Sequence, residues 1–234
     1  MIEDIKRLLT VFEGMSSKLK ENGWIISEPE SPKWWGGVLS PEEVIISAIL
    51  VQQTKWEIVS EVMVRLRQGK LNTLKAIAEL NPVDLANALS GVNLRFTKAN
   101  RLVKIAKAIT LMGGLGALSK LNDNEVREML LSMDGVGYET ADSIMLFALN
   151  RLTIPISTYT IRVIKRVYGY SGSNYEDWRI TLMRLLPRGL YEYKLFHAGV
   201  VTVGKEWCLK GTPRCIECPL RNQCHLAKLK TNGG

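Results

Sequence analysis

Residues 130–141 read LLSMDGVGYETA, an apolar run followed by two closely spaced glycines and the start of another helix. Glycine adopts positive φ without steric cost, so Gly135 and Gly137 permit a tight connection between two helices. The second helix begins with backbone N–H groups that have no partner inside the helix, and such groups bind phosphate oxygens. The stretch therefore predicts a helix–hairpin–helix that contacts a DNA backbone without reading its sequence, although a purely structural turn can have the same glycine pattern.

The predicted DNA contacts come from the hairpin loop and from the first residue of the second helix. Phosphate oxygens reach the loop amides either directly or through a bound monovalent cation. Tyr138 is expected to pack against the deoxyribose or the backbone. The DNA-binding residues predicted in this hairpin are Gly135, Val136, Gly137 and Tyr138.

The rest of the chain is also predicted to be helical. Apolar residues recur at three- and four-residue spacing in residues 3–19, 41–67, 73–80 and 98–111. No alternating stretch is long enough for a sheet, and residues 154–157 are the best candidate for extended chain. The pattern predicts an all-α protein with two helical lobes, because this many helices exceed one simple bundle.

Residues 98–109 show two faces of a helix. The apolar residues fall on one arc of about 120°, and basic residues occupy the remainder. The basic arc is either a solvated face or a face that contacts phosphates. The apolar arc contains Ala99, Leu102, Val103, Ala106 and Ile109, and the basic arc contains Lys98, Arg101, Lys104 and Lys107.

Composition limits the classes of protein to which the chain can belong. Its 234 residues include 31 Lys and Arg against 23 Asp and Glu, and the net charge of +8 favours a polyanionic partner. With 23% charged residues and no low-complexity tract, the chain is not expected to be disordered. No apolar run approaches the roughly 20 residues that span a bilayer, and no secretory signal follows the acidic start. We expect an intracellular protein of the cytoplasm or nucleoid that does not enter a membrane.

The four cysteines have the spacing of a metal site, with six, two and five residues between successive members. A four-cysteine zinc site usually has two Cys-x-x-Cys pairs, and this sequence has one. Disulfides are disfavoured in an intracellular protein. A [4Fe–4S] cluster fits the number and type of ligands best, with zinc as the alternative. The predicted ligands are Cys208, Cys215, Cys218 and Cys224.

The hairpin and the cysteine pattern together resemble the endonuclease III-like helix–hairpin–helix (HhH-GPD) superfamily of DNA glycosylases, over residues 34–224. Within it the chain looks closest to the endonuclease III-related glycosylases that remove alkylated purines. The sequences that carry this resemblance are WW at 34–35, ILVQQTKW at 49–56, ETADSI at 139–144, LYEY at 190–193 and HA at 197–198.

This resemblance implies a particular domain organisation. Residues 41–151 are expected to form a six-helix lobe that contains the hairpin. Residues 1–40 and 152–234 are expected to form a discontinuous helical lobe, with the iron–sulfur cluster at 208–224. The family acts on duplex DNA and flips the damaged base out of the helix, and we expect a monomer.

The chain departs from the family at the position of the lysine that forms a Schiff base in bifunctional members. That position, two residues after the second hairpin glycine, is Glu139. A carboxylate cannot form an imine, so lyase activity through this position is not expected. Glutamate here is similar to the alkylpurine-type relatives, although a glutamate in the first turn of a helix is also favoured by the helix dipole alone.

The second departure is at the family's aspartate, which stabilises a cationic sugar or positions water. The matching residues 156–162 read ISTYTIR and place Ser157 there. A serine carries no charge to oppose a developing cation. Either a cationic alkylated purine leaves readily and Glu139 supplies the carboxylate, or Asp142 or Tyr159 has taken over. The third explanation is a protein that binds damaged DNA without cutting it, or one with an inactivating substitution.

The resemblance also suggests residues that border the flipped base. Gln52, Gln53 and Thr54 are expected to contact DNA, and one of them can fill the gap that the base leaves. The aromatic residues can stack on an extruded purine, although core packing is the commoner role of tryptophan. His197 is expected to be structural, and His225 is expected at the surface. The predicted base pocket contains Trp34, Trp35, Trp56 and Tyr159.

The sequence therefore predicts a DNA base-excision repair enzyme. We expect a monofunctional glycosylase that hydrolyses the N-glycosidic bond of a damaged base, an alkylated purine, in duplex DNA. The alternative is a catalytically impaired or non-catalytic protein of the same fold that binds damaged DNA, because Ser157 replaces the expected aspartate.

Overall fold

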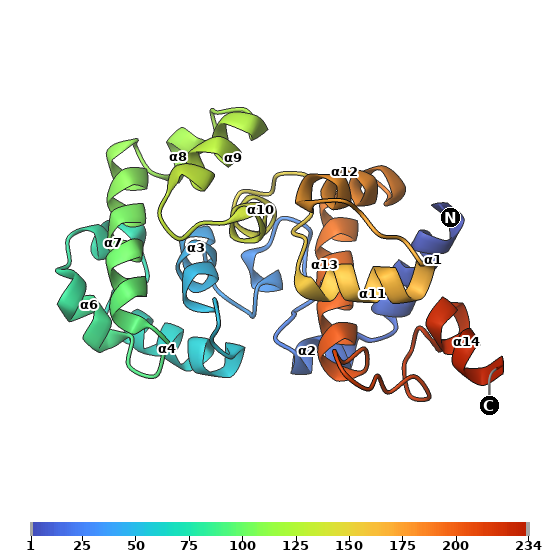
Figure 1. The fold of residues 1–234 in the computed structure, drawn as a ribbon. Coiled ribbons are helices and arrows are strands. Elements are labelled where there is room, and N and C mark those ends of the chain that lie inside the picture. The colour runs from blue at the N-terminus through green and yellow to red at the C-terminus, as the bar shows by residue number, and fades with distance from the viewer. Residues whose placement is uncertain (1, 233–234) are drawn as a thin grey trace. The chain divides into compact units, whose positions relative to one another are not determined.

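The computed structural model describes residues 2–232, which form two compact units (Figure 1). One unit contains residues 31–151, and the other contains the chain up to Glu30 and from Leu152 onward. The first boundary between the units in sequence lies between residues 30 and 31, whereas the sequence analysis expected it between residues 40 and 41. Residues 31–40 belong to the 31–151 unit, in which the Trp35 indole N–H donates to the Ser47 hydroxyl at 3.0 Å. That these units are the hairpin lobe and the cluster lobe of the expected domain organisation stays a prediction.

The 31–151 unit contains the α-helices α3 to α10. Two of them, α5 and α8, are short, and the other six have seven or more residues. The elements are the 3-10 helix η1 (Pro32–Trp34), α3 (Pro41–Leu50), α4 (Trp56–Gln68), α5 (Leu74–Ala78), α6 (Pro82–Ala88), α7 (Arg95–Leu111), α8 (Leu115–Leu118), α9 (Asp123–Ser132) and α10 (Tyr138–Phe147).

Side-chain caps define where several of these helices begin. Ser40 accepts a hydrogen bond from the Glu43 amide at the start of α3, and Pro41 supplies the fixed φ of a first helical residue. Asn122 and Glu125 form a reciprocal capping box at the start of α9. Such caps satisfy amides that would otherwise have no partner, so the helix starts are encoded locally.

The core of this unit lies around α3, α7 and α10. α3 is buried from Glu43 to Leu50, and α10 is buried from Ala141 to Phe147. α10 packs on α3 and α9, while α7 packs on α3, α5 and α6. The apolar arc predicted in α7 is buried as expected, but Lys98 from the basic arc is buried with it.

The segment 41–67, which has one helical pattern, is interrupted at Val51–Lys55. α3 ends at Leu50 and α4 begins at Trp56, and Gln53 between them has a φ of 54°. A left-handed residue cannot continue an α-helix, so the two helices are separate. The apolar spacing of the sequence nevertheless continues across the loop between them.

The second unit is built around the long helix α13, which is buried continuously from Tyr193 to Val200. α13 packs on α1, α2 and α11, and α14 packs on α11. The elements are α1 (Ile2–Glu13), α2 (Ser16–Glu21), α11 (Thr158–Tyr168), α12 (Tyr175–Leu185), α13 (Leu190–Glu206), the 3-10 helix η2 (Arg221–Gln223) and α14 (His225–Asn232).

The structure confirms the all-α prediction. Across residues 2–232 there is no β-strand, and residues 154–157 are non-helical chain before α11. Over the same residues, the helices that are present lack the combination of length and apolar character needed to cross a bilayer.

A glycine sets the close approach of α1 to α13. A Cβ added at Gly199 would lie 2.2 Å from the Phe12 ring, which is itself fully buried. We expect Gly199→Ala to destabilise the protein by about 1–3 kcal/mol through overpacking. Urea unfolding followed by circular dichroism measures this change.

The matched control is Gly211→Ala, because a Cβ at Gly211 meets no atom within 4 Å. The control is expected to change the free energy of unfolding by less than about 0.5 kcal/mol. Equal effects of the two substitutions would show that α1 does not pack against α13 at this position.

Candidate functional site

The hairpin connects α9 to α10 through residues 133–137. Gly135 has a φ of 82°, in the left-handed region that favours glycine. The Val136 amide donates to the Met133 carbonyl at 3.1 Å, which closes the turn, and the Val136 side chain is buried. Gly137 is the N-cap of α10 and no side chain caps this end, while Gly137 and Tyr138 are both exposed. The loop therefore presents an uncapped helix start and an aromatic ring at the surface.

The two helices of the hairpin are joined by a buried ion pair. Arg127 of α9 donates to both carboxylate oxygens of Asp142 of α10, at 2.9 and 3.1 Å. The Arg127 guanidinium also lies 5.3 Å from the centre of the Tyr138 ring. Asp142 is fully buried and engaged with Arg127. Asp142 therefore has a structural role in the hairpin, which disfavours it as a substitute for the family's catalytic aspartate.

The loop between α3 and α4 contacts the hairpin through Gln52. The Gln52 side-chain amide donates to the Gly135 carbonyl at 3.0 Å and to the Thr140 hydroxyl at 3.1 Å. Gln53 is exposed, and its carbonyl accepts from Asn93 at 2.6 Å. Two of the three residues predicted to contact DNA in this loop thus lie beside the predicted DNA-binding hairpin or at the surface.

Thr54, the third predicted contact of this loop, has a different environment. Its side chain is buried, and its hydroxyl accepts from the Lys98 ammonium at 2.9 Å. A buried hydroxyl with this partner supports the loop from inside, so the structure does not place Thr54 where it can touch DNA.

The tryptophans predicted for the base pocket lie mostly in the core. Trp34 is fully buried. Trp35 is also buried, with its ring 5.0 Å from Phe147 and 6.3 Å from Trp56 between centroids. Trp56 is partly exposed. Packing is therefore the role of Trp34 and Trp35 in this structure. Trp56 also packs, against Gly36 and Trp35, and it is the one of the three that is partly exposed.

Glu139 lies in the first turn of α10 and keeps an exposed surface. Desolvation by the surrounding protein nevertheless raises the pKa of its carboxyl to about 7. A helix N-terminus by itself favours the ionised carboxylate, and the rise at Glu139 comes from desolvation. A carboxyl whose pKa lies near neutral pH can accept a proton from water at physiological pH.

Ser157 is buried and forms the N-cap of α11. Its hydroxyl accepts from the Thr160 amide at 3.0 Å, and the Thr160 hydroxyl accepts from the Ser157 amide at 3.2 Å. This reciprocal pair is a capping box. The Ser157 hydroxyl is therefore used in local structure, and it adds no charge to the start of α11.

Tyr159 is half-buried on the first turn of α11, next to α13. A Cβ at Gly204 of α13 would lie 2.5 Å from the Tyr159 ring, and the Arg162 guanidinium stacks 5.0 Å from the ring centre. Arg162 in turn donates to the Cys208 and Gly204 carbonyls at 2.7 and 2.9 Å. The predicted pocket residue Tyr159 thus belongs to a packed contact between α11, α13 and the cysteine loop.

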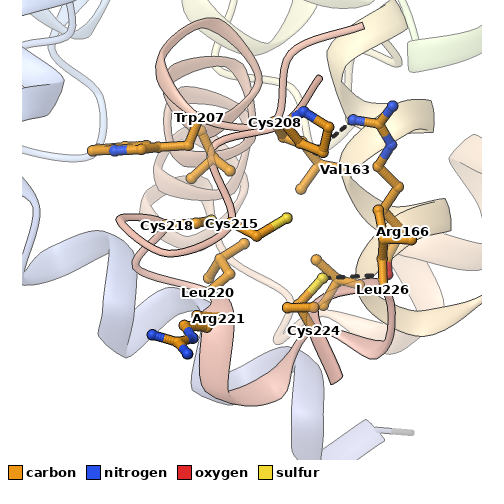
Figure 2. A pocket seen from close by; sticks show the side chains of 14 residues that line it. Val163, Arg166, Trp207, Cys208, Cys215, Cys218, Leu220, Arg221, Cys224 and Leu226 are labelled. Atoms are coloured by element: carbon orange, nitrogen blue, oxygen red, sulfur yellow. Dashed lines mark hydrogen bonds between the residues drawn. The ribbon is translucent and has the colours of Figure 1, made fainter. Parts of the chain in front are cut away.

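The four predicted metal ligands line one largely apolar pocket between α11, the end of α13 and α14 (Figure 2). Cys208 accepts from the Arg166 guanidinium at 3.4 Å, and the Cys224 thiol donates to the Arg166 carbonyl at 3.4 Å. Backbone amides of Leu220, Leu226 and Ala227 point at the sulfurs of Cys218 and Cys224. Arg166 therefore connects this pocket to α11.

The donor set fits an iron–sulfur cluster. Burial raises the pKa of the Cys218 thiol to about 11, so thiolates need a metal centre to be stable here. Amides that donate to cysteine sulfur are a common feature around such clusters. Within residues 2–232, no three His, Cys, Asp or Glu side chains converge closely enough to hold a single metal ion. The four cysteines of this chain line one hollow, and their number and type suit a four-cysteine cluster.

The two histidines have the environments that the sequence suggested. His197 is buried in α13, forms an edge contact with Trp24 at 5.4 Å, and lies 3.3 Å from the Pro155 carbonyl. Desolvation lowers the pKa of His197 to about 4, so it is neutral at pH 7. His225 is exposed beside Cys224.

Comparison with known proteins identifies the family. The family model described as HhH-GPD superfamily base excision DNA repair protein matches residues 46–188, more than half of the chain. A provisionally named DNA repair glycosylase of Methanocaldococcus jannaschii is 31% identical over 195 residues, covering 82% of this chain and 88% of the relative. The chain belongs to the HhH-GPD superfamily of endonuclease III-like DNA glycosylases. The resemblance of the sequence to the endonuclease III-like superfamily is therefore confirmed.

Solved structures of the superfamily share the fold. A non-covalent endonuclease III–DNA complex matches with a TM-score of 0.72 and 21% identity over 99% of both chains. The H. pylori 3-methyladenine DNA glycosylase bound to 1,N6-ethenoadenine matches with a TM-score of 0.67 and 22% identity, over 88% of this chain and 97% of that one. Both likenesses show the fold of this chain.

The sequence analysis missed several residues of the site, and they differ in whether the sequence signals their role. The Arg127–Asp142 pair joins positions on different helices, and nothing in the spacing marks the two as partners. Lys98 has the same sequence context as the lysines of the basic arc, which predicts an exposed side chain. Thr160, three residues after Ser157, has the spacing of a capping box, which is a signal that sequence reasoning can use.

Proposed function

We propose that the protein is a monofunctional DNA glycosylase that releases alkylated purines from duplex DNA. The observation that carries the proposal is Glu139, a carboxyl with a pKa near 7, at the start of the second helix of the hairpin. A glutamate at this position is incompatible with an imine-forming lyase and suits an acid–base role. The 3-methyladenine glycosylase among the structural neighbours supports this class of substrate.

Glu139 acts as a general base in this proposal. Its carboxylate accepts a proton from water as the water oxygen bonds to C1′ of the deoxyribose. The N-glycosidic bond breaks, and its electron pair leaves with the purine. A ring-alkylated purine is cationic before cleavage and leaves as a neutral base, so the departing base needs no proton from the protein.

The environment of Ser157 agrees with a labile substrate. Its hydroxyl caps α11 and supplies no negative charge to oppose a cationic sugar. A substrate with a good leaving group needs less of this stabilisation than a neutral base does. A cationic purine also suits stacking on an electron-rich ring such as Trp56.

The Glu139→Gln substitution tests the proposed base. The amide keeps the size of the side chain but accepts no proton at neutral pH, so we expect base release to fall about 100-fold or more. Because only the ionised form is a base, the wild-type rate should rise as pH increases from 6 to 8, with a midpoint near the pKa of about 7. Release of methylated purine from duplex DNA under single-turnover conditions measures both effects.

The control is Glu128→Gln, which removes an exposed carboxylate on α9. Its rate and pH profile should match the wild type. A Glu139→Gln variant with unchanged rate, or a wild-type rate that falls across this pH range, would rule out Glu139 as the base.

A second candidate function is binding of damaged DNA without base release. It is favoured by the capping box, because the Ser157 hydroxyl is engaged with Thr160 and carries no charge. This candidate shares the hairpin with the first, and the two differ in whether any base is released.

The Ser157→Asp substitution separates the two candidates. Aspartate is also a good N-cap, so α11 should be retained while a charge is added. If Glu139 supplies the carboxylate, base release should change by less than about threefold, which is under 1 kcal/mol of transition-state stabilisation. An inactive wild type together with an active Ser157→Asp variant would instead establish the binding protein with a disabled site. Circular dichroism confirms that both proteins are folded.

We further propose that the four cysteines hold a [4Fe–4S] cluster. When bound, the cluster contributes a structural centre that fixes the loop between α13 and α14. Arg166 contacts Cys208 and the carbonyls of Leu209 and Lys210, at 2.6 and 3.1 Å for the carbonyls. These contacts connect the cluster loop to α11.

The cluster proposal predicts about four irons per chain in anaerobically purified protein, with visible absorption. Cys215→Ala should lose most of the iron. His225→Ala, which changes an exposed neighbour of Cys224, should keep it. Stoichiometric zinc in place of iron in the purified wild type would contradict the proposal.

A further inference from the structure

Lys98 of α7 is the basic residue of the predicted surface arc that turns inward. It is 3% exposed, and its ammonium reaches the loop between α3 and α4. It donates to the Leu50 carbonyl at 2.7 Å and to the Thr54 hydroxyl at 2.9 Å, and it also contacts the Gln52 carbonyl. The three N–H bonds of the ammonium thus meet three acceptors from five consecutive residues.

Among residues 2–232, no Asp or Glu oxygen forms an ion pair with the Lys98 ammonium, and burial lowers its pKa to about 8. A buried ammonium is costly unless it is hydrogen-bonded, and an apolar residue would fill the same face of α7 without that cost. The hydrogen bonds to the three acceptors at the end of α3 and in the loop therefore offset the cost of burying the Lys98 ammonium.

The loop that Lys98 holds contains a strained residue at its surface. Gln53 has a φ of 54°, which is unfavourable for a residue with a Cβ. Lys98 holds the residues on either side of Gln53, and Asn93 holds the Gln53 carbonyl. Such strain persists where the surroundings over-determine the backbone, and it is concentrated at functional sites.

The same loop is coupled to the hairpin. While the Gln52 carbonyl accepts from Lys98, the Gln52 side chain donates to the Gly135 carbonyl and to the Thr140 hydroxyl. A continuous set of hydrogen bonds therefore runs from α7 through the loop to the hairpin. All of these residues lie in the 31–151 unit.

We propose that Lys98 is a positioning residue for lesion recognition, which holds residues 50–54 so that Gln52 and Gln53 keep one register relative to the hairpin. The ammonium itself does not touch DNA. Lys98 therefore contributes to the discrimination between damaged and intact duplex more than to the general affinity for phosphates. This inference rests on the proposed function, because it assumes that the protein recognises a damaged site.

The test uses binding and does not depend on catalysis. A duplex with a tetrahydrofuran abasic-site analogue and the matched intact duplex are titrated with wild type and Lys98→Met. A 2-aminopurine opposite the analogue reports local unstacking. We expect Lys98→Met to lower the ratio of the two affinities about tenfold and to lose the fluorescence rise, while affinity for intact duplex changes less than about threefold.

The matched control is Lys104→Met, which removes an exposed lysine from the same helix. It should leave the ratio and the fluorescence unchanged, with a small loss of affinity for both duplexes. If Lys98→Met does not fold, Thr54→Val removes one acceptor of the ammonium and should lower the ratio in the same direction.

The outcomes separate this inference from the proposed function. A wild type that binds both duplexes equally would overturn lesion recognition and this role of Lys98 together. A wild type that discriminates, with folded Lys98→Met or Thr54→Val variants that discriminate equally well, would overturn the role of Lys98 alone. Parallel losses for both duplexes would identify Lys98 as a general stabiliser and also contradict the proposal.

Discussion

The ion pair between Arg127 and Asp142 is the constraint on which the hairpin depends. Asp142 is fully buried, and leaving a buried carboxylate without its partner costs about 3–5 kcal/mol. The pair fixes α9 against α10, and with them the turn at Gly135. The Gln52 side chain then binds the Gly135 carbonyl, so the α3–α4 loop follows the hairpin. Polar contacts over an apolar core therefore order the part of this unit that is predicted to bind DNA.

The fold was predictable where local patterns and packing agree. The apolar arc of α7, including Ala99 and Ile109, is buried because its spacing matches one face of a helix. The break at Val51–Lys55 was not predictable, since the apolar spacing continues across it and Lys98, whose ammonium binds the Leu50 carbonyl there, is distant in sequence. Lys98 itself has the sequence context of a surface lysine. Only the tertiary structure shows that three acceptors of the loop surround it.

Some residues of the candidate site were also predictable from the sequence, and others were not. The cysteines were predictable because four ligands lie within a short segment and line one pocket. The tryptophans were not, because an aromatic residue in sequence is compatible with both stacking and packing, and burial of Trp34 decides for packing. Residue type also could not show how Thr54 is used. The Thr54 hydroxyl could bind DNA only if no buried donor occupied it, and the buried Lys98 ammonium donates to it.

The environments of Ser157 and Glu139 explain how a change of residue type can preserve the fold and alter the chemistry. Aspartate and serine are both good N-caps, so replacing one by the other keeps the start of α11 intact while removing a charge. A carboxylate in the first turn of α10 would normally be ionised by the helix dipole, but desolvation raises the pKa of Glu139 instead. A carboxylate that felt only the helix dipole would have a low pKa and would therefore be a weak base. Desolvation makes the carboxylate of Glu139 more basic, and acid–base chemistry at neutral pH requires that property.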